Sequence, residues 1–478
     1  MVKFRLLVSA FVFFFCSALW VGGQGVTSSN MAGVVLTETG GAVDGATVVA
    51  THLPTGTTYR ITTSDTGVYR ISGMRVGGPY RVVARAGGFE TKVRSDVVLG
   101  LQQTTDVNFR LNREGEEVFE LEAFEVSAVD QSLIFMSSNQ GSGSVIEEEA
   151  IRNIPSITRS ISDIAKLDSR IAVFDKESGQ LSAGGKNTRY NSLLIDGVPT
   201  NDSFGISESG LPSLKQPFSL EAIAEVSVQF SPYSVENAGF TGAAISAVTK
   251  SGSNEFHGSA FSFYRDDSMV GDLYEVASGD LIPFNDFEEF TYGMTLGGPI
   301  IKDKLFFFVL YESVEETRVR EVSRFLASPT QIADIQEAAL NFATPFDPGI
   351  IDDPDSFVLE DEKLLIKLDW NISEGHRASF RYNTTPGSDP QFPGARGTTF
   401  NSAWYSIDYG LDDYVFELFS NWTSDFSTSL RVSYKEQTRN QVYRNELPEV
   451  RIQGIRDTDD NIGGARTVTL GRGAINDL

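Results

Sequence analysis

Few residues of this chain have the types and spacing that catalysis or metal binding needs. Three histidines occur, at His52, His257 and His376, and none has a neighbouring histidine or an acidic residue three positions later. Common zinc sites need such clusters of ligands. No Gly-x-Ser-x-Gly sequence, which carries the nucleophile of many hydrolases, is present. The sequence therefore predicts a protein that is not an enzyme and has no metal site and no cofactor.

Two other groups of residues have a superficial likeness to chemical sites. Gly184-Gly-Lys186 is similar to the end of a phosphate-binding loop, but Gln180 replaces the first glycine and Asn187 replaces the serine or threonine. The carboxylate pairs Asp352-Asp353 and Asp412-Asp413 fall in expected loops. Solvated charge or weak calcium contact is expected there rather than acid–base catalysis.

The composition excludes some classes of function. The chain has 478 residues, a net charge of −25 and a single cysteine, Cys16. Nucleic-acid binding is excluded, because it needs a basic surface that displaces counterions from phosphates. The acidity by itself indicates only a soluble, self-repelling exterior. An exported chain without disulfides must be stabilised by ordinary packing or by closure of a barrel.

The first residues have the pattern of an export signal. Lys3 and Arg5 precede an apolar run at residues 6–21, and small residues follow at Gly22, Gly23 and Gly25. This order predicts a signal peptide over residues 1–25, cleaved near its end. The alternative is a retained membrane anchor, because the run approaches the span of a bilayer.

Short β-rich runs separated by Gly, Pro and Asp residues occupy residues 28–112. The clearest runs are residues 47–51, 57–62, 68–72, 80–86 and 105–111. Strands at spacings of roughly 8–12 residues with such turns predict an antiparallel sandwich. Apolar residues alternate over 105–111, which predicts a single strand with one buried face and one wet face.

Within this segment the sequence resembles a known family. Gly33-Val-Val-Leu36, Val43-Asp-Gly-Ala-Thr-Val48, Asp65-Thr-Gly-Val-Tyr-Arg-Ile71 and residues 80–89 are similar to the carboxypeptidase regulatory-like domain. The resemblance implies an immunoglobulin-like accessory domain, and the family name does not imply peptidase activity here. Whether the domain binds glycan, peptide or a periplasmic partner is left open.

Residues 113–145 differ in composition from their neighbours. Glutamates surround a short β-prone run, and a Gly/Ser-rich stretch follows at 137–144, which is typical of a flexible linker. The β-prone run consists of Phe124, Glu125, Val126, Ser127 and Ala128. It suits pairing with the sheet edge of another chain, where main-chain hydrogen bonds supply affinity. The alternative is a linker with an incidental apolar patch.

Residues 146–254 contain a series of turns and strands with a short helix. We expect a turn at 150–157 and an amphipathic helix at 161–167, with Ile161, Ile164, Ala165 and Leu167 broadly on one face. A buried strand is expected at 193–195; Asp196-Gly197 is typical of a tight turn, and Pro199 ends the pairing. Another strand is expected at 223–230, and a turn of small residues leads into a further strand within 238–252.

The order of these motifs resembles the plug domain of TonB-dependent outer-membrane receptors. In that family a strand ending in Leu-Ile-Asp-Gly precedes a second strand, a Gly-rich turn and a strand ending in Val-Thr-Lys. The matching residues here are Leu194, Ile195, Asp196, Gly197, Gly239, Gly242, Val248, Thr249 and Lys250. Residues 248–259 and 297–308 are similar to the Oar-like branch of the family.

The resemblance also suggests a role for residues 124–128 and limits what can be inferred about the ligand. The segment is similar to a TonB box, through which such receptors are pulled by TonB and its energising inner-membrane complex. Many members carry Arg-Gly-Pro after the second strand, whereas this chain has Phe230-Ser-Pro232. That departure weakens any inference of a siderophore-type ligand and leaves the expected architecture unchanged.

Residues 255–478 show the alternation of strands that cross an outer membrane. In residues 363–372 one apolar set alternates with a mixed set that contains Lys367, Asp369 and Asn371. After a turn at 373–375, Ala378, Phe380 and Tyr382 are expected to face lipid, and Arg377, Ser379, Arg381 and Asn383 to face the lumen. A hairpin of 414–422 and 426–434 repeats the scheme, with Leu430 and Val432 outward and Arg431 and Ser433 inward.

Length and polarity fit membrane strands, which need about 9–11 residues, aromatic ends and a polar lumen face. Short turns at one end and long polar connections at the other, such as 386–413, are the expected asymmetry. The alternative is a soluble antiparallel sheet with one packed face. About eight strands fit, whereas plugged transporters have about 22, so we expect a fragment or a truncated reading frame of a longer receptor.

The expected fold is mainly β: an immunoglobulin-like sandwich, an α/β plug domain and the first strands of a transmembrane antiparallel barrel. The expected function is import of an external ligand through a plugged barrel, driven by TonB. The expected partners are TonB, outer-membrane lipid and an external oligosaccharide, peptide or metal chelate. The alternative is an outer-membrane adhesin or surface-binding protein without active transport.

Overall fold

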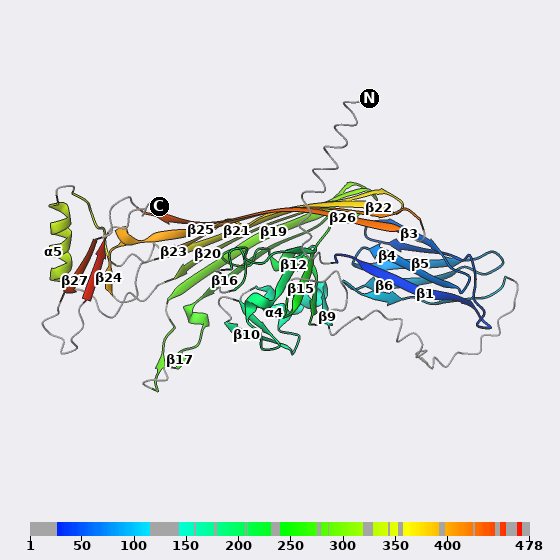
Figure 1. The fold of residues 1–478 in the computed structure, drawn as a ribbon, viewed down its shortest axis with the longest axis horizontal. Coiled ribbons are helices and arrows are strands. Elements are labelled where there is room, and N and C mark those ends of the chain that lie inside the picture. Colours follow the sequence, from blue (N-terminus) through cyan, green and yellow to red (C-terminus); the bar gives the residue numbers. More distant parts are fainter. Residues whose placement is uncertain are drawn as a thin grey trace, which may run out of the picture.

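Figure 1 shows the computed structural model, which consists mainly of strands. The structure describes residues 26–114, 143–156, 159–175, 179–205, 207, 209–230, 240–274, 279–284, 286–318, 328–342, 345–351, 357–391, 397–423, 426–444, 450–455 and 466–470. The expected signal peptide and the expected TonB box lie outside these residues. Among the helices of the described part, none has the length and apolar composition needed to cross a membrane.

The N-terminal part is a sandwich of two sheets, here called the sandwich domain, residues 26–114. One sheet contains β1 (Ser29–Thr37), β4 (Val68–Met74), β7 (Thr104–Asp106) and β8 (Phe109–Leu111). The other contains β2 (Thr47–His52), β3 (Thr57–Thr62), β5 (Gly77–Arg85) and β6 (Lys92–Leu99). Alternate residues of β1, β2 and β5 are buried, so the inward faces form one apolar core.

The sandwich differs in two ways from the sequence prediction. Residues 105–111 form two short strands instead of one, because the Val107 carbonyl accepts a hydrogen bond from the Tyr69 hydroxyl and the Asn108 side chain accepts one from the Val34 amide. The first sheet is also not purely antiparallel, since β7 and β8 both run parallel to β1.

The central domain, residues 143–249, is built on a five-stranded mixed sheet in the order β13-β12-β15-β14-β9. Its strands are β9 (Gly143–Glu147), β12 (Ser192–Ile195), β13 (Val198–Pro199), β14 (Ile223–Gln229) and β15 (Ala244–Thr249). A separate hairpin is formed by β10 (Ile171–Asp175) and β11 (Gln180–Ala183). Helices α3 (Glu148–Asn153) and α4 (Ile161–Ala165) contribute to the same apolar core.

Most of the predicted elements of the central domain are present. The buried strand at 193–195 and the turn at Asp196-Gly197 are confirmed, as is the burial of Ile161, Ile164 and Ala165 on α4. Two details were wrong. Residues 148–153 form a helix where a turn was expected from residue 150 on, and Leu167 lies beyond α4 with 52% of its surface exposed.

Beyond the central domain lies an eight-stranded sheet, here called the long sheet. Its strands are β16 (His257–Asp266), β19 (Phe287–Ile301), β20 (Leu305–Arg318), β21 (Val358–Ser373), β22 (His376–Thr384), β23 (Gly387–Gln391), β25 (Tyr405–Asn421) and β26 (Ser427–Tyr443). All pairs are antiparallel. Among the described residues the sheet is not closed, and β16 and β26 lie at its edges.

The two faces of the long sheet differ in the way that the alternation predicts. The inward face toward the central domain carries buried polar side chains such as Lys367, Arg381 and Asn383. The outward face exposes large apolar side chains, among them Met294, Leu296, Trp370, Phe380, Leu430 and Val432. Ala378, expected to face lipid, is 8% exposed and lies beside Trp370 and Leu418 on the neighbouring strands, whose larger side chains flank it.

The connections at the two ends of the strands are unequal. Short connections, residues 302–304, 374–375 and 422–426, join strands at one end, here called the short-turn end. At the other end lie a β17 (Leu273–Tyr274) and β18 (Leu281–Ile282) hairpin, helix α5 (Pro329–Leu340), and a small sheet of β24 (Gly397–Thr399), β27 (Val450–Ile455) and β28 (Arg466–Leu470). The expected loop at 386–413 is wrong, because it contains β23 and the first part of β25, which pair with each other.

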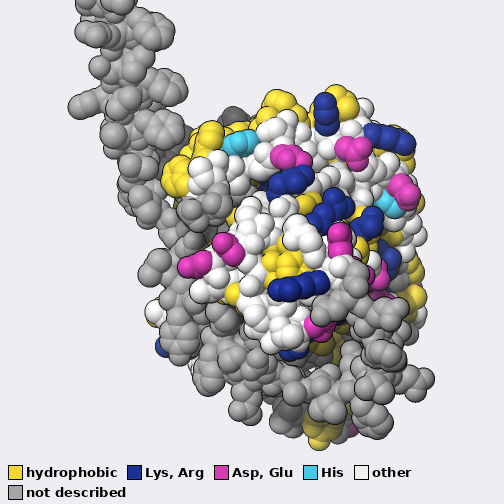
Figure 2. Space-filling model, turned by 90° about the vertical axis from the view of Figure 1, so that its right-hand side faces the viewer, with side chains coloured by type: hydrophobic (Ala, Val, Ile, Leu, Met, Phe, Trp, Pro, Cys, Tyr) yellow, Lys and Arg dark blue, Asp and Glu magenta, His cyan; other side chains and the backbone are white. Residues whose placement is uncertain are grey.

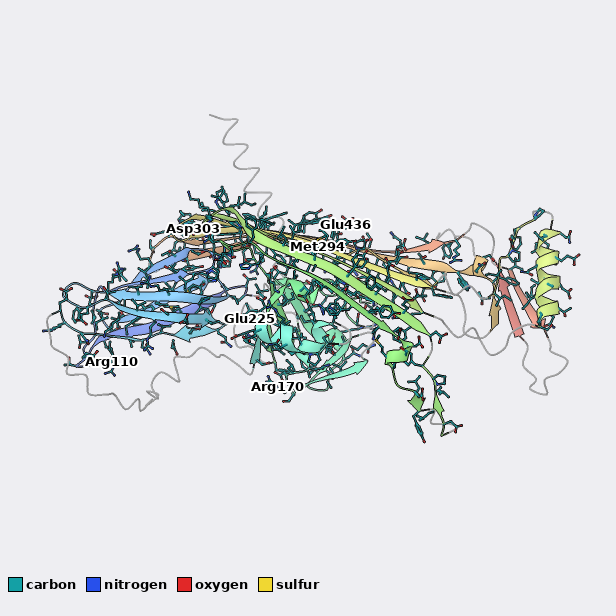
Figure 3. All side chains as sticks on the ribbon, turned by 180° about the vertical axis from the view of Figure 1, so that it is seen from behind. Arg110, Arg170, Glu225, Met294, Asp303 and Glu436 are labelled. Atoms are coloured by element: carbon teal, nitrogen blue, oxygen red, sulfur yellow. The ribbon has the colours of Figure 1, made fainter. Side chains whose placement is uncertain are left out.

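The sandwich domain and the central domain lie on the same side of the long sheet (Figure 1). The central domain lies under the middle of the strands, and the sandwich domain lies under the short-turn end. Figure 3 shows Asp303, in the turn between β19 and β20, next to the sandwich domain, and Glu225 on the central domain where it faces the sandwich domain. All three parts therefore meet where the sandwich domain borders the central domain, towards the short-turn end of the long sheet.

Candidate functional site

The predicted plug motif forms the centre of the contact between the central domain and the long sheet. Asp196 and Gly197 have φ angles of 45° and 72°, so both lie in the left-handed region that a tight hairpin turn of this kind requires. The turn places the Asp196 carboxylate beside the end of β15. Its Oδ1 accepts a hydrogen bond from the Thr249 amide at 2.9 Å, and its Oδ2 accepts one from Thr249 Oγ1 at 2.7 Å.

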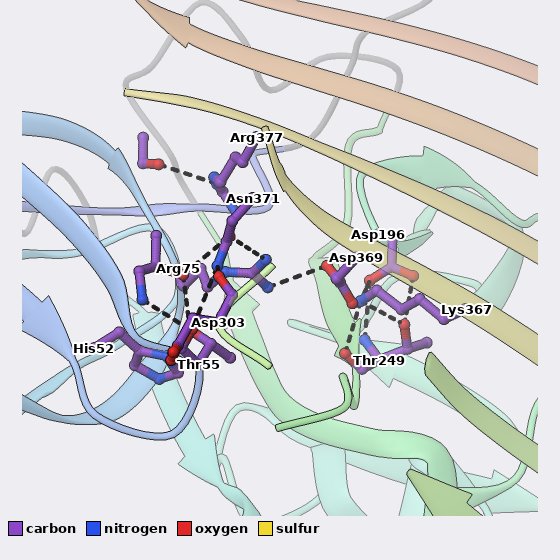
Figure 4. Close-up of polar contacts among 12 residues, drawn as sticks. His52, Thr55, Arg75, Asp196, Thr249, Asp303, Lys367, Asp369, Asn371 and Arg377 are labelled. Carbon is purple, nitrogen blue, oxygen red and sulfur yellow. Dashed lines mark hydrogen bonds and ion pairs between the residues drawn. The ribbon is translucent and has the colours of Figure 1, made fainter. Parts of the chain in front are cut away.

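Two basic side chains of the long sheet, Lys367 and Arg381, complete this site, and Figure 4 shows Lys367 beside Thr249 and Asp196. Lys367 Nζ donates to the carbonyl oxygen and to Oγ1 of Thr249, both at 3.0 Å, and lies 3.8 Å from Asp196 Oδ1. Arg381 Nη1 donates to Asp196 Oδ2 at 2.8 Å, and its Nη2 donates to Asp413 on β25. The Asp196 carboxylate therefore joins three strands, β15, β21 and β22, from different parts of the chain.

The electrostatics keep Asp196 ionised despite its burial. Burial by itself raises the pKa of this carboxyl, but Lys367, Arg381 and the Thr249 hydrogen bonds outweigh that effect and lower the pKa to about 2. The side chains of Arg381 and Asp196 are only 3% and 9% exposed. Removing one member of such a buried pair leaves an uncompensated charge, which costs about 3–5 kcal/mol.

The other motif residues hold this turn in place. Leu194 and Ile195 are buried in β12, which runs parallel to β15. Gly242 lies so close to Asn191 that an added Cβ would meet its Oδ1 at 2.1 Å, so a side chain does not fit there. Val248 pairs with Glu225, and Lys250 Nζ lies 3.0 Å from Glu148 Oε1. Gly239 lies outside the described residues.

Most further contacts between the central domain and the long sheet are polar. Ser219 Oγ donates to Glu312, which is also paired with Lys363 at 2.8 Å. Lys215 lies 2.8 Å from both Glu289 and Glu316. On the other side, Asn383, Lys435 and Gln437 donate to backbone or side-chain oxygens of the 201–217 loop. The apolar part is small, with Ala222 against Phe308, Leu310 and Leu365.

A second set of contacts was not predicted at all and joins the sandwich domain to the short-turn end. Arg75 Nη1 lies 3.1 Å from Asp369 Oδ1, with side chains 7% and 5% exposed. Burial opposes the charged form of Arg75, but Asp369 beside it raises the pKa above its usual value. No pattern in the sequence marks Arg75 as the partner of a residue 294 positions away. Sequence reasoning found the inward positions of Lys367 and Arg381 but not their partners.

The candidate chemical groups of the sequence do not assemble into a site. Asp412 and Asp413 lie in β25 rather than in a loop; Asp412 accepts a hydrogen bond from Tyr382 at 2.8 Å, and Asp413 pairs with Arg381. Gly184 and Gly185 form an exposed turn after β11. Within the described ranges, no group of His, Cys, Asp or Glu residues is arranged to hold a metal ion. Asp352 and Asp353 fall outside those ranges.

Comparisons with known proteins agree with this architecture. Residues 248–356 match the family described as outer membrane beta barrel domain, and residues 30–112 match the carboxypeptidase regulatory-like domain. The chain is therefore an outer-membrane protein of mainly β structure, with an N-terminal immunoglobulin-like domain. It is a homologue of the TonB-dependent transporter Oar of Myxococcus xanthus, with 29% identity over 346 residues, 69% of this chain and 30% of that protein.

The similar solved structures include an outer membrane transporter and a siderophore receptor. The outer membrane transporter YddB of Escherichia coli is 14% identical with a TM-score of 0.49, covering 69% of this chain and 43% of that one. The siderophore receptor PirA of Acinetobacter baumannii is 15% identical with a TM-score of 0.42, covering 68% and 43%. The chain thus spans about a third to a half of the length of the proteins it matches.

Proposed function

We propose that this chain is part of a TonB-dependent receptor that binds an external ligand and imports it through a barrel occupied by the central domain. Force applied by TonB at residues 124–128 displaces part of the central domain from the long sheet. The homology to Oar supports this proposal. The ligand class is left open among oligosaccharides, peptides and metal chelates.

The observation that carries the proposal is the polar contact around Asp196. Fully apolar cores separate only at the cost of exposing large apolar surface to water. The contact between the central domain and the long sheet is built mainly of ion pairs and hydrogen bonds such as Asp196–Arg381 and Ser219–Glu312. When such a contact opens in a water-filled lumen, water replaces the lost hydrogen bonds, so the net cost of each is only about 1 kcal/mol.

The direct test is binding of the periplasmic domain of the host's TonB to the full chain, purified in detergent. The test variant carries Glu125→Pro and Val126→Pro, which removes two main-chain donors that a paired strand needs. The matched control carries Ser137→Pro and Ser138→Pro in the Gly/Ser-rich stretch of the same linker. We expect binding by the unaltered chain and by the control, and at least a tenfold loss in the test variant.

The other outcomes are equally informative. If the unaltered chain is folded but does not bind TonB, the proposed energised transport is wrong and a static outer-membrane anchor is favoured. If both proline variants bind as well as the unaltered chain, TonB does not pair with residues 124–128.

A further inference from the structure

The sandwich domain is attached to the rest of the molecule through a buried polar interface. Arg75 extends from the loop after β4 and forms an ion pair with Asp369 of β21 at 3.1 Å (Figure 4). Its Nη2 also donates to Asn371 Oδ1 at 3.3 Å. An arginine that is 7% exposed in this interface would lose its buried partner if the domain moved away. The pair therefore marks a specific docked position.

Several hydrogen bonds around Arg75 fix the same position. Asn371 Nδ2 donates to the Thr55 carbonyl oxygen at 3.3 Å and to the Asp303 carbonyl oxygen at 2.9 Å, and Thr57 Oγ1 donates to Asn371 Oδ1 at 3.0 Å. Asn371, near the end of β21, thus joins the β2–β3 turn of the sandwich domain to the turn between β19 and β20. The Asn254 amide donates to the Pro54 carbonyl oxygen at 2.8 Å, which joins the same turn to the entry of β16.

A third contact lies on β22 and β25. Arg377 Nη2 donates to the Gly73 carbonyl oxygen at 3.0 Å, and its guanidinium lies over the Phe419 ring at 4.0 Å. Gly73 has a φ angle of 68°, and a Cβ there would meet Phe419 at 3.5 Å. The sandwich domain consequently touches three neighbouring strands of the long sheet, β21, β22 and β25, at or near the short turns.

The sandwich domain also forms hydrogen bonds with the central domain. The Leu101 amide donates to Glu225 on β14, and Gln102 Nε2 donates to Ser246 Oγ on β15 at 3.3 Å. Gln229 Nε2 donates to Gln102 Oε1 at 2.6 Å. Strands β14 and β15 are neighbours in the sheet that carries Asp196 and Thr249 at its edge toward the long sheet.

These contacts border a space, partly open to solvent, at the junction of the three parts. A cavity of about 970 Å³ has walls from the sandwich domain, the central domain and the long sheet, including Arg75, Thr249 and Asp369. The sandwich domain lies beyond the central domain at the short-turn end (Figure 1). Figure 2 looks onto the sandwich end and shows basic and acidic side chains interspersed over it, as expected of a surface in water rather than in lipid.

We propose that the sandwich domain is a gate at the short-turn end, and that it must undock from Asp369, Asn371 and Glu225 before the central domain can leave the long sheet. The gate rests on the proposed function, since the force that opens it comes from TonB. Docked, the domain forms one wall of the cavity and braces β14 and β15. Undocked, it leaves the cavity open at the end through which the ligand departs.

The test measures the docked fraction by crosslinking in cells. Arg60 and Glu374 face each other across the periphery of the interface at 3.9 Å and are 58% and 68% exposed, so cysteines there do not disturb the buried contacts. The variant carries Arg60→Cys and Glu374→Cys in a Cys16→Ser background, and a bismaleimide joins the two thiols. The matched control pair, Ser64→Cys and Thr66→Cys, lies within the sandwich domain with its hydroxyl oxygens 2.9 Å apart.

We expect a high yield of the Arg60–Glu374 crosslink in cells that lack TonB and a yield several-fold lower in cells with energised TonB. The control pair should give the same yield in both, because its two residues stay close together whether or not the domain is docked. Adding Arg75→Met should lower the interface yield several-fold without TonB. The control substitution is Arg70→Met, on the exposed side of β4, which should leave the yield unchanged.

The results separate the gate from the transport proposal. If purified TonB binds the chain but the interface yield is the same with and without energised TonB, the gate is wrong and the proposed function stands. If TonB does not bind, the proposed function fails first. If Arg75→Met leaves the crosslink yield unchanged, the buried ion pair does not hold the domain and the docked gate is wrong.

Discussion

Two buried regions of this molecule are built in opposite ways. The core of the sandwich domain consists of apolar and aromatic side chains such as Met31, Val48 and Tyr80, all fully buried. The contact between the central domain and the long sheet is buried to a similar degree around Asp196, Thr249 and Arg381, yet it consists mainly of charged and hydrogen-bonded groups. The first holds one domain together, and the second joins two parts that we propose to separate.

The physical difference lies in the cost of opening. Exposure of apolar surface costs about 25 cal/mol per Å², with no compensation from water. Polar groups regain hydrogen bonds to water, so the net cost of separating both partners is small, although removal of one partner alone is expensive. Substitutions should therefore affect the two regions differently.

The largest effect is expected in the sandwich core. Tyr80 is fully buried, and its hydroxyl donates to the Arg75 carbonyl oxygen at 2.7 Å. Tyr80→Ala should lower the free energy of unfolding of the sandwich domain by about 3–5 kcal/mol, because a large cavity replaces the ring. Urea denaturation followed by proteolysis of residues 26–114 measures this. Tyr80→Phe, the matched control, should lose only about 1 kcal/mol with its hydrogen bond.

A similar but local effect is expected at the polar contact. Asp196→Asn leaves Lys367 and Arg381 without the Asp196 carboxylate and should cost about 3 kcal/mol. Hydrogen exchange of backbone amides measures this effect. We expect faster exchange in β12, β13 and β15 and unchanged exchange in the sandwich domain. The double variant Asp196→Asn with Arg381→Met should be less destabilised than the sum of the single variants. An additive result would show that the two side chains are not coupled.

Acid should weaken the sandwich domain through His52. Burial, and next Arg75 and Arg377, lower the pKa of His52 from 6.5 to about 3. Between these two pKa values the unfolded chain binds a proton that the folded chain does not. The contribution of His52 to stability is therefore complete above pH 6.5 and decreases as the pH drops towards 3. The slope is at most about 1.4 kcal/mol per pH unit. Thermal unfolding between pH 7 and 4 measures the slope. His52→Gln should flatten it; an equal slope in the variant would contradict this assignment.

The smallest effect is expected at the contact between the sandwich and central domains. Burial raises the pKa of Glu225 to about 7, against the effect of the Leu101 amide, and the neighbouring Glu147 adds to the rise. The group contributes stability that is complete below pH 4.5 and is lost as the pH rises through 7. At pH 8 the amides near Leu101 should exchange faster in the unaltered chain than in Glu225→Gln. Equal exchange in both would show that the carboxyl charge does not affect this contact.

Local patterns in the sequence were enough for many elements. Residues 57–62 were expected as a strand and form β3, and the Asp196-Gly197 turn follows a buried strand as its composition indicates. The alternation of Lys367 and Asp369 with Ile366 and Leu368 predicts which face of β21 is polar. These features depend on residues close together in the sequence, so the hydrophobic periodicity of a segment predicts them directly.

Contacts distant in the sequence were not predictable in the same way. Residues 105–111 have the alternation of one strand but form two, because Tyr69 and Asn108 take over backbone hydrogen bonds. Residues 386–413 have the polar composition of a loop, yet β23 and β25 pair there because the neighbouring strands offer free edges. The composition of a segment does not show which strand or side chain will lie beside it in the folded chain.

Local sequence patterns were sufficient to predict the turn at Asp196 and the polar character of one face of the long sheet. They did not predict that Arg381 and Lys367 contact Asp196 and Thr249, or that Arg75 contacts Asp369; these contacts are visible only in the folded chain. The reason is that an ion pair between residues 185 or 294 positions apart depends on strand register and on the positions of the domains. Those are set by the packing of whole sheets against each other.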